Sequence, residues 1–210
     1  MTKLEYKEIY ADKQLSDFVK RFWTIENPSL TEHNYTVLPD GYFDIVLFMT
    51  ERRIVKVSLA GFYTKGFEVS IPENTTLFGV SFKPLAAEYI LQLSVSNAIN
   101  QHIHLPNDTF CLDKIPTTNF NEWAEKLHCT TRYLNRYFQS YFGLSLKAYS
   151  NILRCKASYK DIKENKLYPS GNFADQAHFI KEIKKHTGTT PKILARNEND
   201  RFIQFSTRPT

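Results

Sequence analysis

Residues 131–142 carry polar side chains at a spacing that suits the recognition of DNA bases. In a helix, Arg132, Asn135, Arg136 and Gln139 fall within one arc of about 100°, and apolar side chains fill the opposite arc. Arginine suits the O6 and N7 atoms of guanine, and asparagine or glutamine suits the N6 and N7 atoms of adenine. The pattern indicates either a helix that reads base edges in the major groove or an ordinary solvated helix face.

Residues 174–187 predict a second polar helix, with Gln176 and His178 in its first turn and lysines further along. Gly188 and Pro191 follow and should end it. An amide and an imidazole there fit either a catalytic site or a contact with bases. Catalysis needs a nucleophile or a metal ligand at a matching spacing, which the sequence does not show, so we expect no enzymatic activity. For His178 we favour packing inside the protein over base contact.

The elements around these two helices predict a helical second half of the chain. A short helix at 119–128, which starts with a capping-box pattern, precedes helix 131–142 after a tight connection. This helix–turn–helix order is the one that lets a second helix enter the major groove. Gly143 should end helix 131–142, and one long helix is expected over residues 144–166.

The first half of the chain reads as mixed α and β. Helices are expected at residues 16–25, where Phe18, Val19 and Phe22 have a helical spacing, and at residues 85–93. Strands are expected in four apolar runs bounded by turn residues, at 43–49, 52–62, 65–71 and 75–84.

Charge and composition separate the two halves. Residues 116–210 contain 16 Lys and Arg against 8 Asp and Glu, whereas the whole chain contains 27 and 22. This asymmetry suggests either that the second half meets a polyanion or that it has a solvated basic surface. Residues 105–118 hold two prolines and no sustained periodicity, which indicates a linker.

Several classes of protein are disfavoured. No apolar run approaches the roughly 20 residues that cross a bilayer, and the first ten residues lack the apolar core of a secretory signal. The three cysteines are widely spaced, which fits a reducing cytoplasm. Zinc ligands would have to come from a loosely spaced set, namely His102, His104, Cys111, His128 and Cys129. We therefore expect a cytoplasmic protein that uses no metal or other cofactor.

Acidic and aromatic residues of the first half raise the question of a ligand site. A Pro-Asp-Gly turn accounts for Asp40 without chemistry. Asp44 alternates with apolar neighbours, so it faces either a cavity or the solvent, and a ligand role for Asp44 and Trp23 stays open. The aromatic residues that could line a small pocket or simply pack the core are Trp23, Tyr42, Phe43, Phe48, Phe62, Tyr63 and Phe82.

These stretches together resemble the AraC/XylS family of bacterial transcription regulators. The resemblance is carried by TTRYLNRYFQSYFGLSLKAY and by FADQAHFIKEIKKHTGTTPKIL, which are similar to the two recognition helices of that family and their continuations. It covers about residues 119–195. More weakly, DFVKRFWTIE, LPDGYFDIVLF and FGVSFKPLAAEYIL resemble the small N-terminal domain of one branch of these regulators.

The resemblance implies roles for individual residues. The positions that face the groove fall on Arg132, Asn135, Arg136, Gln176, Ala177 and Lys181. Ala177 could contact only a thymine methyl group. The position of further basic residues around the two helices suits either phosphate contacts, which position a protein without specifying sequence, or a basic surface that only keeps the protein soluble. These residues are Lys147, Arg154, Lys184, Lys185, Lys192 and Arg196. The family's second scaffold helix is replaced here by NKLYPSGN, in which Pro169 and Gly171 disfavour a helix, so the second motif is shortened.

The sequence thus predicts a mixed α+β sensor-like domain at 1–104, a linker at 105–118 and an all-α double helix-turn-helix domain at 119–210. The expected function is sequence-specific binding of double-stranded DNA by helix 131–142, with helix 174–187 one turn further along the duplex. The N-terminal domain would bind a small-molecule effector or mediate association into a homodimer. Two alternatives are a degenerate regulator that binds DNA non-specifically and acts through protein contacts, and an enzyme with a β-rich catalytic domain.

Overall fold

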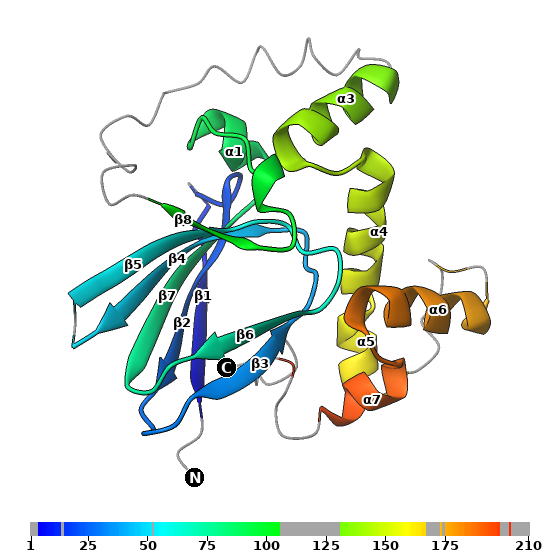
Figure 1. The fold of residues 1–210 in the computed structure, drawn as a ribbon. Coiled ribbons are helices and arrows are strands. Elements are labelled where there is room, and N and C mark those ends of the chain that lie inside the picture. The colour runs from blue at the N-terminus through cyan, green and yellow to red at the C-terminus, as the bar shows by residue number, and fades with distance from the viewer. Residues whose placement is uncertain are drawn as a thin grey trace.

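The computed structural model describes residues 4–13, 15–51, 53–105, 131–166, 173, 175–197 and 202, and for residues 131–134 and 137 it describes the backbone alone. Figure 1 shows a β-rich N-terminal part with the helices of the C-terminal part stacked along one side of it. The helix expected at 119–128 lies outside the described residues. So does the expected linker, apart from Leu105, which ends the last strand.

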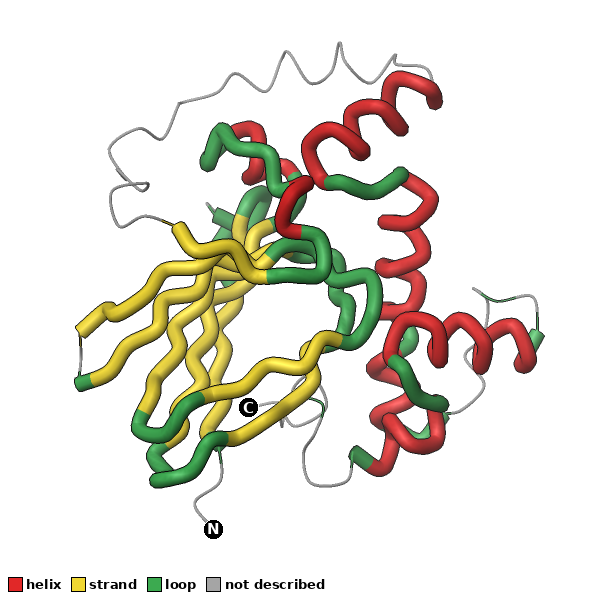
Figure 2. Tube along the Cα trace, in the orientation of Figure 1, coloured by secondary structure: helices red, strands yellow, loops and turns green. Residues whose placement is uncertain are grey.

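The N-terminal part consists of two antiparallel sheets that face each other (Figure 2). The larger sheet has six strands in the order β1-β2-β7-β4-β5-β8. These strands are β1 (Glu5–Tyr10), β2 (Val19–Asn27), β7 (Thr75–Phe82), β4 (Phe43–Thr50), β5 (Arg53–Ala60) and β8 (His102–Leu105). The smaller sheet pairs β3 (His33–Val37) with β6 (Phe67–Ile71).

The four strands expected from the apolar runs are confirmed as β4, β5, β6 and β7. Strands β1, β3 and β8 were not expected. The helix expected at 85–93 is shorter, because α1 covers Leu85–Tyr89 and a 3-10 turn, η1, follows at Ser96–Ala98.

The helix expected at residues 16–25 was wrong, because this stretch leads into strand β2. Every second residue of Val19–Asn27 is buried or lines the cavity described below, which is the period of a strand. Polar Arg21 and Asn27 occupy inward positions and disguise this alternation. Phe22 faces the opposite side of the sheet, so its spacing from the apolar residues before it only imitated a helix.

The C-terminal part is helical, as expected. Its helices are α3 (Thr131–Phe142), α4 (Leu146–Ala157), α5 (Tyr159–Lys163), α6 (Gln176–Thr187) and α7 (Pro191–Arg196). The single helix expected over 144–166 is divided at Ser158. The Ser158 hydroxyl donates to the carbonyl of Cys155 at 2.6 Å, and this side-chain bond competes with the helical ladder at the point where α4 ends.

The two parts share a hydrophobic core. Phe62, from the segment after β5, makes edge-to-face contacts with Phe142 of α3 and Tyr149 of α4, with ring centroids 5.7 and 5.9 Å apart. Phe142 and Ile152 are each 1% exposed in the same cluster as Phe43 of β4. Helix α3, which carries the first set of candidate DNA-reading residues, is therefore fixed to the sheet by apolar packing together with α4.

Candidate nucleic-acid interface and a cavity in the N-terminal domain

Helix α3 is amphipathic in the manner expected from its sequence. Phe138, Tyr141 and Phe142 pack against the shared core, whereas Arg136 and Gln139 on the other side are exposed. Gly143 ends the helix at a φ of +71°, in the left-handed region that glycine tolerates, and its N–H donates to the carbonyl of Gln139. The side chain of Arg132 lies outside the described residues.

Two of the predicted base readers in α3 also bond to the turn that follows it. The Asn135 Oδ1 atom accepts from the backbone N–H of Leu146 at 3.3 Å, and the Gln139 Nε2 atom donates to the carbonyl of Gly143 at 3.1 Å. These bonds fix the α3–α4 connection. Arg136 is the exposed guanidinium that α3 presents among the side chains that the structure describes.

Helix α6 begins with a side-chain cap. Asp175 accepts from the backbone N–H of His178 at 2.7 Å, which satisfies one of the free donors of the first turn. Gln176, Ala177 and Lys181 are exposed. His178 is half-buried with its ring edge-on to Phe173, a contact that favours the packing role expected for it.

The N-terminal part supports the other end of α6. His186 is 5% exposed, and its Nδ1–H donates to the carbonyl of Thr64, between β5 and β6, at 2.8 Å. A Cβ added to Gly66 would lie 3.1 Å from the carbonyl oxygen of Thr187, so the same segment passes close to the end of α6. The residues expected to replace the second scaffold helix lie mostly outside the described part of the chain.

The residues expected to bind phosphates divide into two groups. Those with exposed side chains are Lys147, Lys184, Lys185, Lys192 and Arg196. Arg154 differs, because it donates to Asn151 at 2.9 Å and lies 3.9 Å from the carboxylate of Glu182. Its guanidinium also lies 5.3 Å from the centre of the Phe173 ring, so Arg154 ties α4 to α6.

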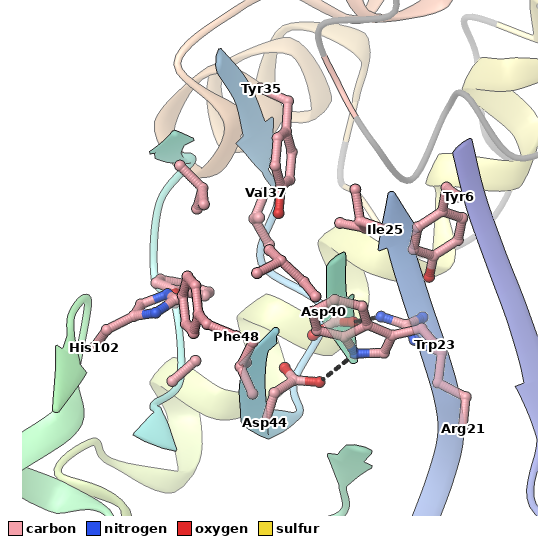
Figure 3. Close-up of a pocket in the computed structure, with 15 residues that line it drawn as sticks. Tyr6, Arg21, Trp23, Ile25, Tyr35, Val37, Asp40, Asp44, Phe48 and His102 are labelled. Carbon is pink, nitrogen blue, oxygen red and sulfur yellow. Dashed lines mark hydrogen bonds and ion pairs between the residues drawn. The ribbon is translucent and has the colours of Figure 1, made fainter. Parts of the chain in front are cut away.

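A cavity lies between the two sheets of the N-terminal part (Figure 3). Aromatic and aliphatic side chains form most of its wall, and Arg21, Asp40, Asp44 and His102 supply the charged and titratable groups. The aromatic wall residues are Tyr6, Trp23, Tyr35, Phe48 and Tyr63. Three of the aromatic residues proposed from sequence are among them, while Phe43, Phe62 and Phe82 belong to the shared core instead.

Asp44, on β4, is one of the residues that line this cavity. Its Oδ1 atom accepts from Nε1 of Trp23 at 2.9 Å (Figure 3) and from the Ser81 hydroxyl. Burial, with the nearby Asp40 carboxylate, raises the pKa of Asp44 to about 6, although Arg21 and the two hydrogen bonds act in the opposite direction. Of the alternatives left open for Asp44, the structure places it at a cavity.

Arg21 and Asp40 form an ion pair in the cavity wall, with Nη2 and Oδ2 2.8 Å apart. Glu8 lies 3.6 Å from the Nε atom of the same guanidinium. Arg21, Tyr35 and Tyr6 were missed from the sequence. Arg21 lies two residues before Trp23 and four before Ile25, and this period-2 spacing is the signal that could have identified an inward-facing charge.

His102, which the sequence offered only as one member of a loosely spaced set of zinc ligands, is part of β8 and lines the cavity. It bonds to the hydroxyl of Tyr63 and stacks on Phe67, with ring centroids 5.5 Å apart. Burial and the nearby charge of Lys56 lower the pKa of His102. Within the described ranges, no group of three His, Cys, Asp or Glu side chains is placed to hold a metal ion.

The turn that carries Asp40 also contacts the helices of the C-terminal part. The Tyr159 hydroxyl in α5 donates to the carbonyl of Pro39 at 3.0 Å, and the Tyr149 hydroxyl in α4 donates to the carbonyl of Gly41 at 3.2 Å. Lys156 Nζ lies 3.7 Å from the centre of the Tyr42 ring. The segment from Pro39 to Tyr42 therefore reaches from the cavity wall to α4 and α5.

Comparisons with known proteins match two separate stretches of the chain. Residues 123–197 match the family described as Helix-turn-helix domain, and residues 7–104 match the Domain of unknown function (DUF6597). The structure of ToxT from Vibrio cholerae aligns with 92% of this chain and 97% of its own, at a TM-score of 0.36 and 10% identity. A comparison with curated proteins gives no match. Among the helices that the structure describes, none is long and apolar enough to span a membrane.

Proposed function

We propose that this chain reads a specific DNA sequence with helix α3. It belongs to the AraC-type transcription regulators and joins a DUF6597 domain to a helix-turn-helix DNA-binding domain. The observation that carries this proposal is the division of α3 into two faces. Its aromatic face is packed against Phe62 and the sheet, which leaves Arg136 exposed on the opposite face. A guanidinium held on a rigid helix can make the bidentate contact that distinguishes guanine from the other bases.

Helix α6 is proposed as the second reader, through Gln176, Ala177 and Lys181. The exposure of these three side chains and the Asp175 cap support this role. Two helix-turn-helix readers on one side of a duplex contact major-groove segments about one helical turn apart. Exposed lysines would contact phosphates around these segments; they are Lys147, Lys184, Lys185 and Lys192.

The N-terminal domain is proposed to bind a small effector in its cavity, and this binding is proposed to change the position of the C-terminal helices. Asp40 lines the cavity. The carbonyls of its neighbours Pro39 and Gly41 accept hydrogen bonds from the hydroxyls of Tyr159 and Tyr149, respectively. An effector that moved Asp40 would therefore move acceptors of α4 and α5. The regulator would act in the bacterial cytoplasm, where its DNA lies, as a monomer or a homodimer.

A second candidate is a regulator that binds DNA without strong sequence preference and acts through protein contacts. It is favoured by the internal bonds of Asn135 and Gln139, which engage two of the expected base readers in the α3–α4 connection. The sequence NKLYPSGN points the same way, since its Pro169 and Gly171 disfavour a helix where the resemblance places the second scaffold helix.

Selection of binding sites from random duplex DNA with the full-length chain, at about 150 mM salt, separates these candidates. Enrichment of a motif with two segments about one helical turn apart supports reading by both α3 and α6. A motif of one segment leaves α3 as the reader. Absence of enrichment, with binding that vanishes as salt rises, is the outcome expected for the non-specific regulator.

A further inference from the structure

We propose that the cavity of the N-terminal domain binds a small organic cation of the alkylammonium type, which Asp44 pairs with and the aromatic wall surrounds. This inference rests on the proposed function, since it names the chemistry of the effector of that same cavity. It is argued from the charges in the wall, from the bonds of Asp44 and from the arrangement of the rings.

The charged groups of the wall leave one negative charge without a partner. Arg21 is paired with Asp40 at 2.8 Å and approaches Glu8 at 3.6 Å, so its positive charge is compensated. His102 does not supply a second positive charge, because burial and Lys56 favour its neutral form by lowering its pKa. The remaining ionisable groups in the wall are tyrosines, and Asp44 is therefore the charge that a ligand would meet.

The hydrogen bonds of Asp44 favour a ligand at its second oxygen. Both donors, Trp23 and Ser81, bond to Oδ1, and the structure records no hydrogen bond to Oδ2 from the residues that it describes. A buried carboxylate is costly unless it is paired. A cation beside Oδ2 would provide that pair, whereas an anionic ligand would face the carboxylate at close range.

The aromatic rings that line the cavity come from separate elements. Trp23 lies on β2, Tyr35 on β3, Phe48 on β4, Tyr6 on β1 and Tyr63 after β5, and all five line the cavity. Aromatic walls bind quaternary and other alkylammonium ions through the negative faces of the rings. Figure 3 shows the Trp23 ring beside Asp44, with the hydrogen bond between them as a dashed line.

The position of the Trp23 ring depends on a glycine. Trp23 pairs in register with Gly79 of β7, and a Cβ added at Gly79 would overlap the indole ring. The ring therefore lies flat over a residue without a side chain. This close approach fixes one wall of the cavity without using any of the polar groups that a ligand would need.

The test is calorimetric titration of the full-length wild-type protein at pH 7.5, with tetramethylammonium and choline as cationic probes. The neutral control is 3,3-dimethyl-1-butanol, which has nearly the shape of choline but no charge. We expect saturable binding of at least one cation, at least 10-fold tighter than binding of the neutral analogue. Equal affinity for choline and the neutral analogue, or no binding of either cation up to about 10 mM, would overturn the proposal. This comparison needs no variant.

A pair of variants then locates the binding charge. Asp44→Asn keeps an oxygen that can accept from Trp23 and Ser81, and Asp17→Asn removes an exposed carboxylate instead. We expect Asp44→Asn to weaken cation binding at least 10-fold and to leave the neutral analogue within about 2-fold, with Asp17→Asn unchanged. Equal cation binding by Asp44→Asn would place the ligand elsewhere and overturn the proposal.

The groups that face Asp44 are Arg21, Asp40, Tyr6, Tyr35, Tyr63 and Ser81. Protonation of Asp44 at low pH should weaken binding of the cation, so the affinity for the cationic probe is expected to fall as the pH is lowered through about 6. No DNA is present in these titrations. A failure of sequence-specific DNA binding would thus not contradict the cation site. Cation binding without any effect on DNA affinity would contradict the proposed sensor role alone.

Discussion

The Nδ1 atom of His186 in α6 lies 2.8 Å from the carbonyl oxygen of Thr64, the residue that follows Tyr63 in the cavity wall. A second contact has the same form, since Tyr159 of α5 bonds to the carbonyl of Pro39, the residue before Asp40. In both cases a helix of the DNA-binding domain is held by the backbone next to a cavity side chain. These two bonds therefore connect segments of the cavity wall directly to α6 and α5.

Replacement of His186 tests the first contact. His186→Leu removes the donor and leaves the carbonyl of Thr64 without it, so we expect the free energy of unfolding to fall by about 1–3 kcal/mol. His186→Asn is the matched control, because its amide can donate from nearly the position of Nδ1. Urea unfolding should show a smaller loss for Asn than for Leu. An Asn variant as unstable as the Leu variant would mean that packing of the ring, and not the hydrogen bond, holds α6.

Tyr159→Phe tests the second contact. The hydroxyl is buried and donates to the Pro39 carbonyl, so its removal should cost about 1–2 kcal/mol of unfolding free energy. Tyr10→Phe serves as control, because the Tyr10 hydroxyl bonds to Glu8 at the exposed surface and should matter by less than about 0.5 kcal/mol. If the wild-type protein binds choline, Tyr159→Phe should also reduce the effect of choline on DNA affinity. Fluorescence anisotropy measures this effect. A full effect in the variant would exclude this turn as the connection.

Asp44→Asn should change how stability depends on pH. The pKa of Asp44 is raised to about 6 in the folded protein from an ordinary 3.8, so the folded state favours the protonated acid. The stability that this preference contributes is complete below about pH 4 and is lost as the pH rises through 6. As the pH rises from 4 to 7, the free energy of unfolding of the asparagine variant should therefore increase by about 1–3 kcal/mol relative to that of the wild type.

Urea unfolding at both pH values, with Asp17→Asn as an exposed control, measures this difference. Because the other titrating groups are common to all three proteins, they cancel when each variant is compared with the wild type. A difference between Asp44→Asn and wild type that stayed constant from pH 4 to pH 7 would show that Asp44 has no raised pKa.

Arg136→Ala and Lys184→Ala should have different signatures on DNA. If Arg136 contacts a guanine in two places, its loss should cost about 1–3 kcal/mol on the preferred duplex and much less on a scrambled one. Lys184→Ala should weaken both duplexes alike and lower the slope of log K against log salt by about one. Anisotropy titrations at several salt concentrations measure both quantities. Identical behaviour of the two variants would remove the distinction between base readers and phosphate contacts.

Much of the fold could be predicted because the relevant signals are local. Residues 43–49 are an apolar run behind a Pro-Asp-Gly turn, and helix 131–142 combines a two-faced pattern with Gly143 at its end. Both elements form where expected. The division of α4 from α5 was missed because it depends on the hydroxyl of Ser158 bonding to the carbonyl of Cys155, and a serine at that position is also compatible with a continuous helix.

The cavity could not be assembled from the sequence, because its parts meet only through strand order. Trp23 on β2 pairs with Gly79 of β7, and Asp44 on β4 pairs with Ser81 of β7. Strands β2 and β4 are therefore the two neighbours of β7 in the sheet. The sequence left a ligand role open for both Trp23 and Asp44 but gave no reason to place their side chains in contact with each other. The same holds for His186, whose partner Thr64 belongs to the other domain.

The central claim, that the exposed face of α3 reads bases, is tested most directly by selecting binding sites for Arg136→Ala in parallel with the wild type. The account predicts that the wild type enriches a motif with a guanine in the segment read by α3. The variant should lose preference at that one position and keep the rest of the motif. A variant that enriched the same motif, with the same preference at every position, would show that Arg136 does not read a base.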